Sequence, residues 1–175
     1  AAKILCFTYF RPMKERKRIL VAPLDWGIGH ATRCIPIIKA LISHNFEVII
    51  AADNRPLHLL TTEFPDLEAI RFGGYNVKYP TYFPMILNMI FQIPKILLGI
   101  KKEHTTIENI IEDYKIDGVI SDNRFGLSTK KVPCVFITHQ LRIQSSFFID
   151  VIQKFNYQYI NKYNACWVMD DEKVN

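Results

Sequence analysis

The residue types best suited to chemistry lie in one short segment, Asp25-Trp26-Gly27-Ile28-Gly29-His30, between an apolar run and a stretch with helical spacing. The first N–H groups of a helix lack partners inside the helix and give its N-terminus a partial positive charge. Glycines beside them let a phosphate or a sugar approach the backbone closely. The segment therefore predicts a substrate site at Gly27 and Gly29. The alternative is a tight turn that binds nothing.

His30 falls at the start of that helical stretch, next to any ligand held there. A neutral imidazole can take a proton from an attacking hydroxyl near neutral pH. Asp25 is close in sequence and would orient the ring, so we predict His30 and Asp25 as catalytic residues. The alternative is a structural histidine that caps the helix. Arg33 replaces the third glycine of G-x-G-x-x-G, and no Gly-Lys-Ser/Thr follows, so neither common nucleotide-binding motif is present.

Two more polar loops follow apolar runs, at Ser121–Gly126 and at Thr138–Gln140. Ligands of open α/β sheets bind at the carboxyl ends of strands, which is where both loops would lie. The alternative for the first loop is an ion pair between Asp122 and Arg124 that only holds its shape. The predicted substrate-binding residues of these loops are Asp122, Asn123, Arg124, His139 and Gln140.

Apolar runs and helical spacings alternate along the chain. Strands are predicted over 19–23, 46–52, 67–72, 117–121, 132–138 and 165–169, and helices over 31–44, 56–63 and 144–163. Pro36 is expected in or near the first helical turn and Asn54 as a helix cap. The strands are continuously apolar, which is typical of strands buried on both faces. The fold class is therefore α/β: a Rossmann-like parallel sheet with helices on both faces.

The composition fits one globular domain. The chain has 175 residues, 49% of them hydrophobic and 22% charged, which excludes a disordered chain, and its net charge of +5 favours anionic partners. Its basic residues are scattered, so no nucleic-acid partner is expected. The four cysteines lack zinc or redox spacing, and we expect no metal and no cofactor. Residues 1–18 are interpreted as an extension of doubtful origin, with a natural start at Met13, and residues 19–175 as the domain.

Residues 82–100 form an almost wholly apolar run that contains two prolines and is surrounded by lysines. The prolines and three polar residues argue against a membrane span. One interpretation is a helix packed in the core or under another domain. The other is a patch that dips into an anionic membrane surface. Its predicted membrane-contact residues are Lys78, Phe83, Met85, Phe91, Lys95, Lys101 and Lys102.

The segment ILVAPLDWGIGHATRCIPIIKAL resembles the first strand, glycine-rich loop and helix of GT-B glycosyltransferases. It is most similar to family 28, which includes the peptidoglycan transferase that adds N-acetylglucosamine to a lipid-linked acceptor. DGVISDNRFGL and VPCVFITHQL resemble later strands of the same half, so the likeness covers about residues 19–169. WGIGHATRC with SDNRFGL is similar to a branch common in Bacteroidetes-type genomes. Trp26 departs from the small residue of the family's loop, which implies a differently shaped acceptor pocket.

The resemblance implies the N-terminal, acceptor-binding half of a two-domain enzyme. The nucleotide-sugar donor, a UDP-sugar, would bind a C-terminal domain that is absent from this chain. We expect that domain either beyond Asn175 or in a separate partner chain, and we expect the isolated chain to be inactive. The acceptor would be a lipid-linked or cell-envelope glycan, and the protein cytoplasmic, at the inner face of the plasma membrane. The alternatives are a non-catalytic Rossmann-like, membrane-associated binding module and half of a nucleotide-sugar epimerase.

Overall fold

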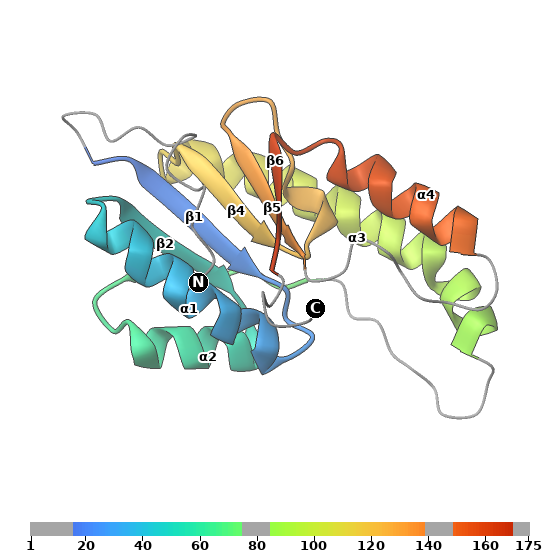
Figure 1. The fold of residues 1–175 in the computed structure, drawn as a ribbon, viewed down its shortest axis with the longest axis horizontal. Helices are drawn as coiled ribbons and strands as arrows, with labels where there is room; N and C mark the ends of the chain where they lie inside the picture. The colour runs from blue at the N-terminus through green and yellow to red at the C-terminus, as the bar shows by residue number, and fades with distance from the viewer. Residues whose placement is uncertain (1–15, 75–84, 139–148, 170–175) are drawn as a thin grey trace, which may run out of the picture.

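The structure of the chain is a computed structural model that describes residues 16–74, 85–138 and 149–169, without the side chains of residues 85–93 and 149–152. Six parallel strands of these residues form one sheet in the order β3-β2-β1-β4-β5-β6 (Figure 1). The sheet confirms the predicted α/β fold class. Its strands are β1 (Arg18–Pro23), β2 (Glu47–Ala52), β3 (Glu68–Arg71), β4 (Gly118–Asp122), β5 (Cys134–Thr138) and β6 (Ala165–Val168).

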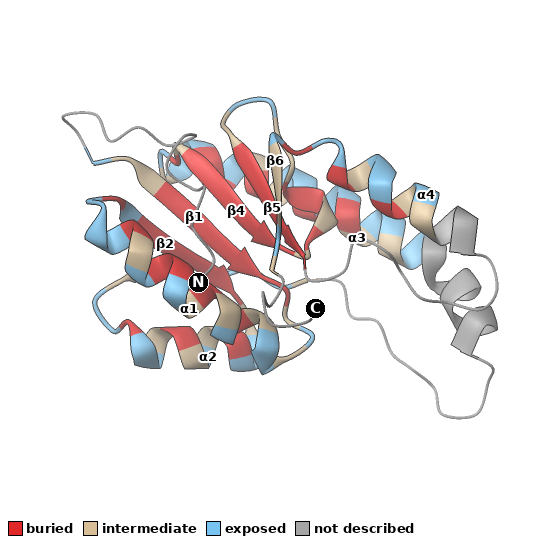
Figure 2. Ribbon diagram, viewed as in Figure 1, coloured by how far each residue is buried: buried red, intermediate tan, exposed pale blue. Residues whose placement is uncertain are grey.

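The central strands are buried on both faces, as their continuous apolar sequences predict. Every residue of β4 and β5 is buried, and so is every residue of β1 and β2 after the first (Figure 2). The edge strands β3 and β6 are more exposed. All six strands lie within two residues of their predicted ends, because each apolar run is bounded by polar or turn residues.

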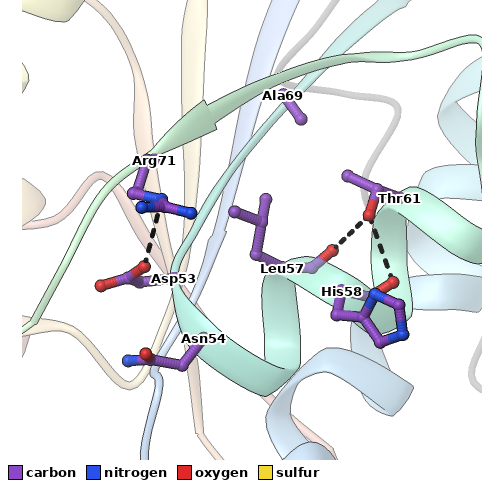
Figure 3. A pocket seen from close by; sticks show the side chains of 7 residues that line it. All are labelled: Asp53, Asn54, Leu57, His58, Thr61, Ala69 and Arg71. Carbon is purple, nitrogen blue, oxygen red and sulfur yellow. Dashed lines mark hydrogen bonds and ion pairs between the residues drawn. The ribbon is translucent and has the colours of Figure 1, made fainter.

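Helices cover both faces of the sheet. α1 (Ile28–Ser43) and α2 (Asn54–Glu63) pack on one face, where Ile38 of α1 contributes to the same apolar cluster as Val21 and Ile50. α3 (Met85–Asp113) and α4 (Ile149–Ile160) pack on the other, where Ile107 of α3 clusters with Leu20 and Phe136. A short 3-10 helix, η2 (Phe125–Leu127), follows β4. An open groove with a cavity volume of about 670 Å³ lies between α2 and β3 (Figure 3).

Two predicted helix starts are wrong. α1 begins at Ile28, directly after the glycine-rich loop, so Pro36 lies inside the helix rather than in its first turn. Asp53, not Asn54, occupies the N-cap position of α2, and Asn54 is the first helical residue, with a φ of 51°. Asparagine tolerates this left-handed conformation better than most residues, which explains why the chain can turn there.

The apolar run at 82–100 falls largely within α3, which continues to Asp113 through a charged segment that the sequence analysis left unassigned. Helical spacing persists there, with Ile107, Ile110 and Ile111 buried. In the described part of the chain no helix is long and apolar enough to cross a membrane. The helix predicted over 144–163 is α4, and residues 144–148 of that prediction lie outside the described residues.

Candidate active site

The candidate site lies where the strand order reverses. β1 pairs with β2 on one side and β4 on the other, and Pro23 at the end of β1 lies opposite Asp122 at the end of β4. The loop after β1 is tied to β4 because the Leu24 N–H donates to the Asp122 carbonyl oxygen at 3.0 Å. Such a switch point at the carboxyl ends of strands is where ligands of open α/β sheets bind.

Asp122 organises the polar side chains at this point. Its carboxylate is fully buried and accepts a hydrogen bond from Arg33 Nη2 at 3.0 Å. His30 Nδ1 lies 3.2 Å from the other carboxylate oxygen, Oδ2. The Arg33 guanidinium also lies 2.5 Å from the same ring nitrogen. The site therefore joins the first turns of α1 to the end of β4 through one buried carboxylate.

His30 Nδ1 has two neighbours that call for different tautomers. Arg33 Nη2 can donate to Nδ1 only when this nitrogen is unprotonated. With the proton on Nδ1, the ring instead presents an N–H 3.2 Å from Asp122 Oδ2, a buried oxygen that has no hydrogen-bond partner among the described residues. Leaving such an oxygen unsatisfied costs about 1–3 kcal/mol. The Nδ1–H tautomer leaves Nε2 as the unprotonated nitrogen, which is the state that a general base needs. The His30 side chain is 15% exposed, so the ring is partly accessible to solvent.

Asp122 and Arg124 do not form the ion pair that was the structural alternative for this loop. Asn123 between them has a φ of 60°, in the left-handed region. This conformation breaks the alternation of side chains along an extended chain. The Asp122 side chain therefore faces α1, whereas the Arg124 side chain lies on the opposite face of the sheet, against Glu103 of α3.

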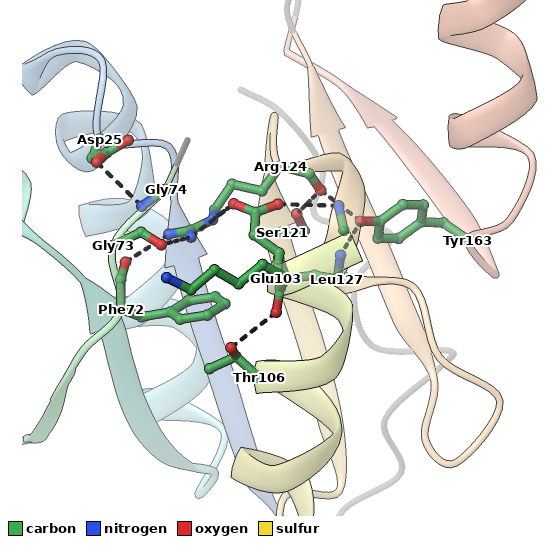
Figure 4. A network of polar contacts seen from close by, with 12 residues as sticks. Asp25, Phe72, Gly73, Gly74, Glu103, Thr106, Ser121, Arg124, Leu127 and Tyr163 are labelled. Atoms are coloured by element: carbon green, nitrogen blue, oxygen red, sulfur yellow. Dashed lines mark hydrogen bonds and ion pairs between the residues drawn. The ribbon is translucent and has the colours of Figure 1, made fainter. Parts of the chain in front are cut away.

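Arg124 lies inside the protein rather than at the surface of the loop (Figure 4). Its guanidinium bonds to Glu103 Oε1 at 2.8 and 2.9 Å, stacks over the Phe72 ring at 4.0 Å, and donates to two carbonyl oxygens after β3. Burial raises the pKa of Glu103 despite this cation. These contacts give Arg124 a structural role, and the substrate contact predicted for it stays a prediction.

Asp25 does not orient His30 as the sequence analysis expected. The structure places Asp122 beside the ring, and it turns Asp25 toward Gly74, whose N–H lies 3.3 Å from Oδ2. Oδ1 of Asp25 is buried and has no hydrogen-bond partner in the described part of the chain. A β-carbon at Gly74 would lie 2.6 Å from that oxygen, so a larger residue there would require this carboxylate to move.

Gly27 and Gly29 are not needed for the backbone turn. Neither has a φ in the left-handed region, and the backbone of Gly27 is extended, with a φ of 172°. A β-carbon at either residue would meet no atom of the described residues within 4 Å. What the two glycines leave is open space above the start of α1, whose first N–H groups lack a side-chain cap. This agrees with room for a ligand better than with a tight turn.

The structure describes only some of the remaining predicted site and membrane-contact residues. His139, Gln140, Lys78 and Phe83 lie outside the described residues, and so do the side chains of Met85 and Phe91. Lys95, Lys101 and Lys102 are exposed on α3 near Leu98, whose exposed fraction is 69%.

Sequence reasoning missed Arg33 and Glu103, which hold Asp122 and Arg124. Arg33 stands three residues after His30, one helical turn away, and that spacing was the available signal. Glu103 had none, because its partner lies 21 residues later. No group of histidine, cysteine, aspartate or glutamate side chains among the described residues could hold a metal ion.

A parallel sheet in this strand order, with helices on both faces (Figure 1), defines a Rossmann-like domain. MurG of Acinetobacter baumannii matches with a TM-score of 0.58 at 11% identity, over 91% of this chain and 43% of that one. UGT89C1 of Arabidopsis thaliana, solved with quercetin, matches with a TM-score of 0.57 at 9% identity, over 87% and 43%.

SnogD of Streptomyces nogalater, another glycosyltransferase, matches with a TM-score of 0.50 at 13% identity, over 85% of this chain and 40% of that one. The sequence matches no protein-family model and no curated protein. At these identities the likeness shows the fold: the chain folds as the N-terminal domain of a GT-B glycosyltransferase and resembles family 28. It spans less than half the length of these structures.

Proposed function

We propose that this chain is the acceptor-binding domain of a glycosyltransferase that moves a sugar from a nucleotide-diphosphate donor, a UDP-sugar, to a lipid-linked or cell-envelope acceptor. The observation that carries the proposal is the pair formed by His30 Nδ1 and Asp122 Oδ2, 3.2 Å apart, at the switch point of this fold. The donor would bind a second domain outside this chain.

In this proposal, His30 Nε2 takes the proton of an acceptor hydroxyl, and the hydroxyl oxygen bonds to the anomeric carbon of the donor sugar. The bond from that carbon to the nucleotide diphosphate breaks, and the diphosphate leaves with the electron pair. The buried Asp122 carboxylate stabilises the imidazolium that forms, as a general base of this kind requires. Arg33 holds that carboxylate in place.

The acceptor would lie over the start of α1. The N–H groups of Gly27, Gly29 and His30 can bind its phosphate or sugar oxygens, because the helix N-terminus favours negative charge there. Asn123, His139 and Gln140 are proposed as further contacts. The buried Asp25 oxygen beside Gly74 is available to accept a hydrogen bond from an acceptor hydroxyl.

Membrane contact is proposed for α3. Leu98 is 69% exposed, and the exposed cations Lys95, Lys101 and Lys102 surround it. Apolar side chains amid lysines bind an anionic membrane surface by burial and by charge attraction together. The proposal places the protein in the cytoplasm, at the inner face of the plasma membrane, where a lipid-linked acceptor is within reach.

The experiment is to express the product of the complete gene and incubate it with UDP-sugars and a lipid extract of the source cells. UDP release and a new glycolipid, identified by mass spectrometry, are the expected results. UDP release with no glycosylated product would indicate hydrolysis instead. Epimerised donor without transfer would contradict the proposal and favour an epimerase.

A further inference from the structure

The groove between α2 and β3 is a second polar hollow that the proposed chemistry does not use (Figure 3). It lies beside the edge strand, at and below the carboxyl ends of β2 and β3. Donors and acceptors of several kinds share its surface, and Leu57 and Ala69 add a small apolar part. The polar side chains that line it are Asp53, Asn54, His58, Thr61 and Arg71.

Asp53 has the residue type and the backbone conformation of a helix N-cap, yet it does not cap α2. Its φ and ψ are −139° and 168°, but its side chain makes no capping hydrogen bond. An aspartate at this position usually stabilises a helix by accepting a hydrogen bond from its first N–H groups, and Asp53 does not do so. It lies instead at the groove, with its Oδ1 3.7 Å from Arg71 Nε.

The Arg71 guanidinium is available to a ligand. Its side chain is 82% exposed, and the separation from Asp53 is longer than a hydrogen bond. A guanidinium presents a planar fork of N–H donors that fits a carboxylate or a phosphate. The groove therefore places two complementary side chains next to each other. The Asp53 carboxylate can accept hydrogen bonds from hydroxyl groups, and the Arg71 guanidinium can donate hydrogen bonds to an anion.

The groove adjoins the candidate active site through the two glycines after β3. A β-carbon at Gly73 would lie 3.2 Å from Asp53 Oδ2, and one at Gly74 would lie 2.6 Å from Asp25 Oδ1. Consecutive residues thus contact one carboxylate from each region. A ligand that occupied both regions would pass beside these two residues, neither of which carries a side chain.

We propose that the α2–β3 groove binds an acidic sugar unit of the acceptor. Asp53 accepts hydrogen bonds from ring hydroxyls, and Arg71 pairs with a carboxylate or phosphate on the same ring. The inference rests on the proposed function, because it assigns the sugar to an acceptor bound by this domain. It adds the chemical class of that acceptor: a glycan that carries negative charge on a sugar ring.

The test is a titration of the ¹⁵N-labelled 175-residue chain, followed by NMR, with glucose, glucuronic acid and glucose 6-phosphate. Shifts are expected at α2 and β3, with at least one acidic sugar bound about tenfold more tightly than glucose, because a hydrogen bond to a charged group is stronger than one between neutral groups. The two acidic sugars show whether the groove prefers carboxylate or phosphate.

Arg71→Gln should remove about that tenfold preference and leave glucose binding unchanged. Arg55→Gln is the matched control, because Arg55 is also exposed and near the start of α2 but does not line the groove. Equal losses in both variants, equal affinity for glucose and the acidic sugars, or no shift at α2 and β3 would each overturn the proposal. His30→Ala should leave the binding of acidic sugars to the groove intact. A failure of the groove proposal can therefore be distinguished from a failure of the proposed sugar transfer.

Discussion

His30, Arg33 and Asp122 share one hydrogen-bonded centre, although 89 residues separate Arg33 from Asp122 along the chain. The sequence offered Asp25 as the partner of His30 because it is the carboxylate nearest in sequence. Sheet pairing instead brings the end of β4 beside the end of β1. The residue types of the site were thus predictable, but the pairing of those residues depended on a strand order that single-sequence patterns do not fix.

Substitutions of two glycines, Gly29 and Gly126, can distinguish an effect on ligand binding from an effect on stability. Gly29→Ala should keep or slightly raise the thermal midpoint, because alanine is favoured over glycine in a helix by about 0.5–1 kcal/mol and its β-carbon would meet no atom of the described part of the chain within 4 Å. In the complete enzyme the acceptor KM should rise about tenfold, as expected if the methyl group intrudes on the ligand by about 1.4 kcal/mol.

Gly126→Ala is the contrasting variant. Its β-carbon would lie 2.5 Å from Glu103 Cβ and 2.6 Å from the Ile100 carbonyl oxygen. Overpacking of this kind costs about 1–3 kcal/mol, so the thermal midpoint should fall. Equal midpoints for the two variants would contradict the assignment of open space to Gly29.

The buried thiols should be unreactive in the folded chain. Burial raises the pKa of Cys134 to about 11 and that of Cys34 well above its usual value. At pH 8 a pKa near 11 leaves about one thiolate in a thousand, and only the thiolate is alkylated. Iodoacetamide at pH 8 should therefore label both residues only in urea, as read by peptide mass spectrometry. Rapid labelling of native Cys134 would show that the strand is not buried as described.

At the scale of elements, Arg124 and Glu103 join the ends of β3 and β4 to α3. Burial raises the pKa of Glu103 even beside a guanidinium, so the pair is better understood as fixing positions than as adding net stability. It holds the carbonyl oxygens of Phe72 and Gly73 and so sets the backbone against which Asp25 lies.

Glu103→Gln should destabilise the chain by about 3–5 kcal/mol in urea unfolding, because it leaves a buried cation without its counter-ion. Glu108→Gln is the control on the same helix. Glu108 also pairs with a cation, Lys131, but near the surface, and its loss should barely move the midpoint. Similar effects of the two substitutions would show that the Arg124 pair is not the tie between these elements.

The elements themselves followed closely from sequence, because buried parallel strands are short apolar runs with polar boundaries. The helix starts did not. The start of α1 depends on the loop before it, and the α2 cap position is occupied by a residue whose side chain turns away. The second half of α3 was unassigned, since its charged surface masks a stripe of three isoleucines.

At the scale of the whole molecule, the exposed apolar surface on α3 gives the membrane proposal a direct test. Leu98→Glu should reduce co-sedimentation with phosphatidylserine vesicles several-fold, because it removes apolar burial and adds repulsion from anionic headgroups. Ile42→Glu is the control, since Ile42 is a 42% exposed apolar residue on α1, across the sheet. Equal losses would contradict a membrane surface centred on α3.

The central claim is that His30, paired with Asp122, is the base of a glycosyl transfer. The most direct measurement is the transfer rate of the complete gene product with His30→Ala, beside His44→Ala, at the C-cap of the same helix, as the control for histidine loss. The account predicts that His30→Ala lowers kcat by about 10²–10⁴-fold, the usual contribution of a general base. It also predicts that nucleotide-sugar binding persists and that His44→Ala is near wild type. A His30→Ala enzyme with an unchanged kcat would contradict the claim.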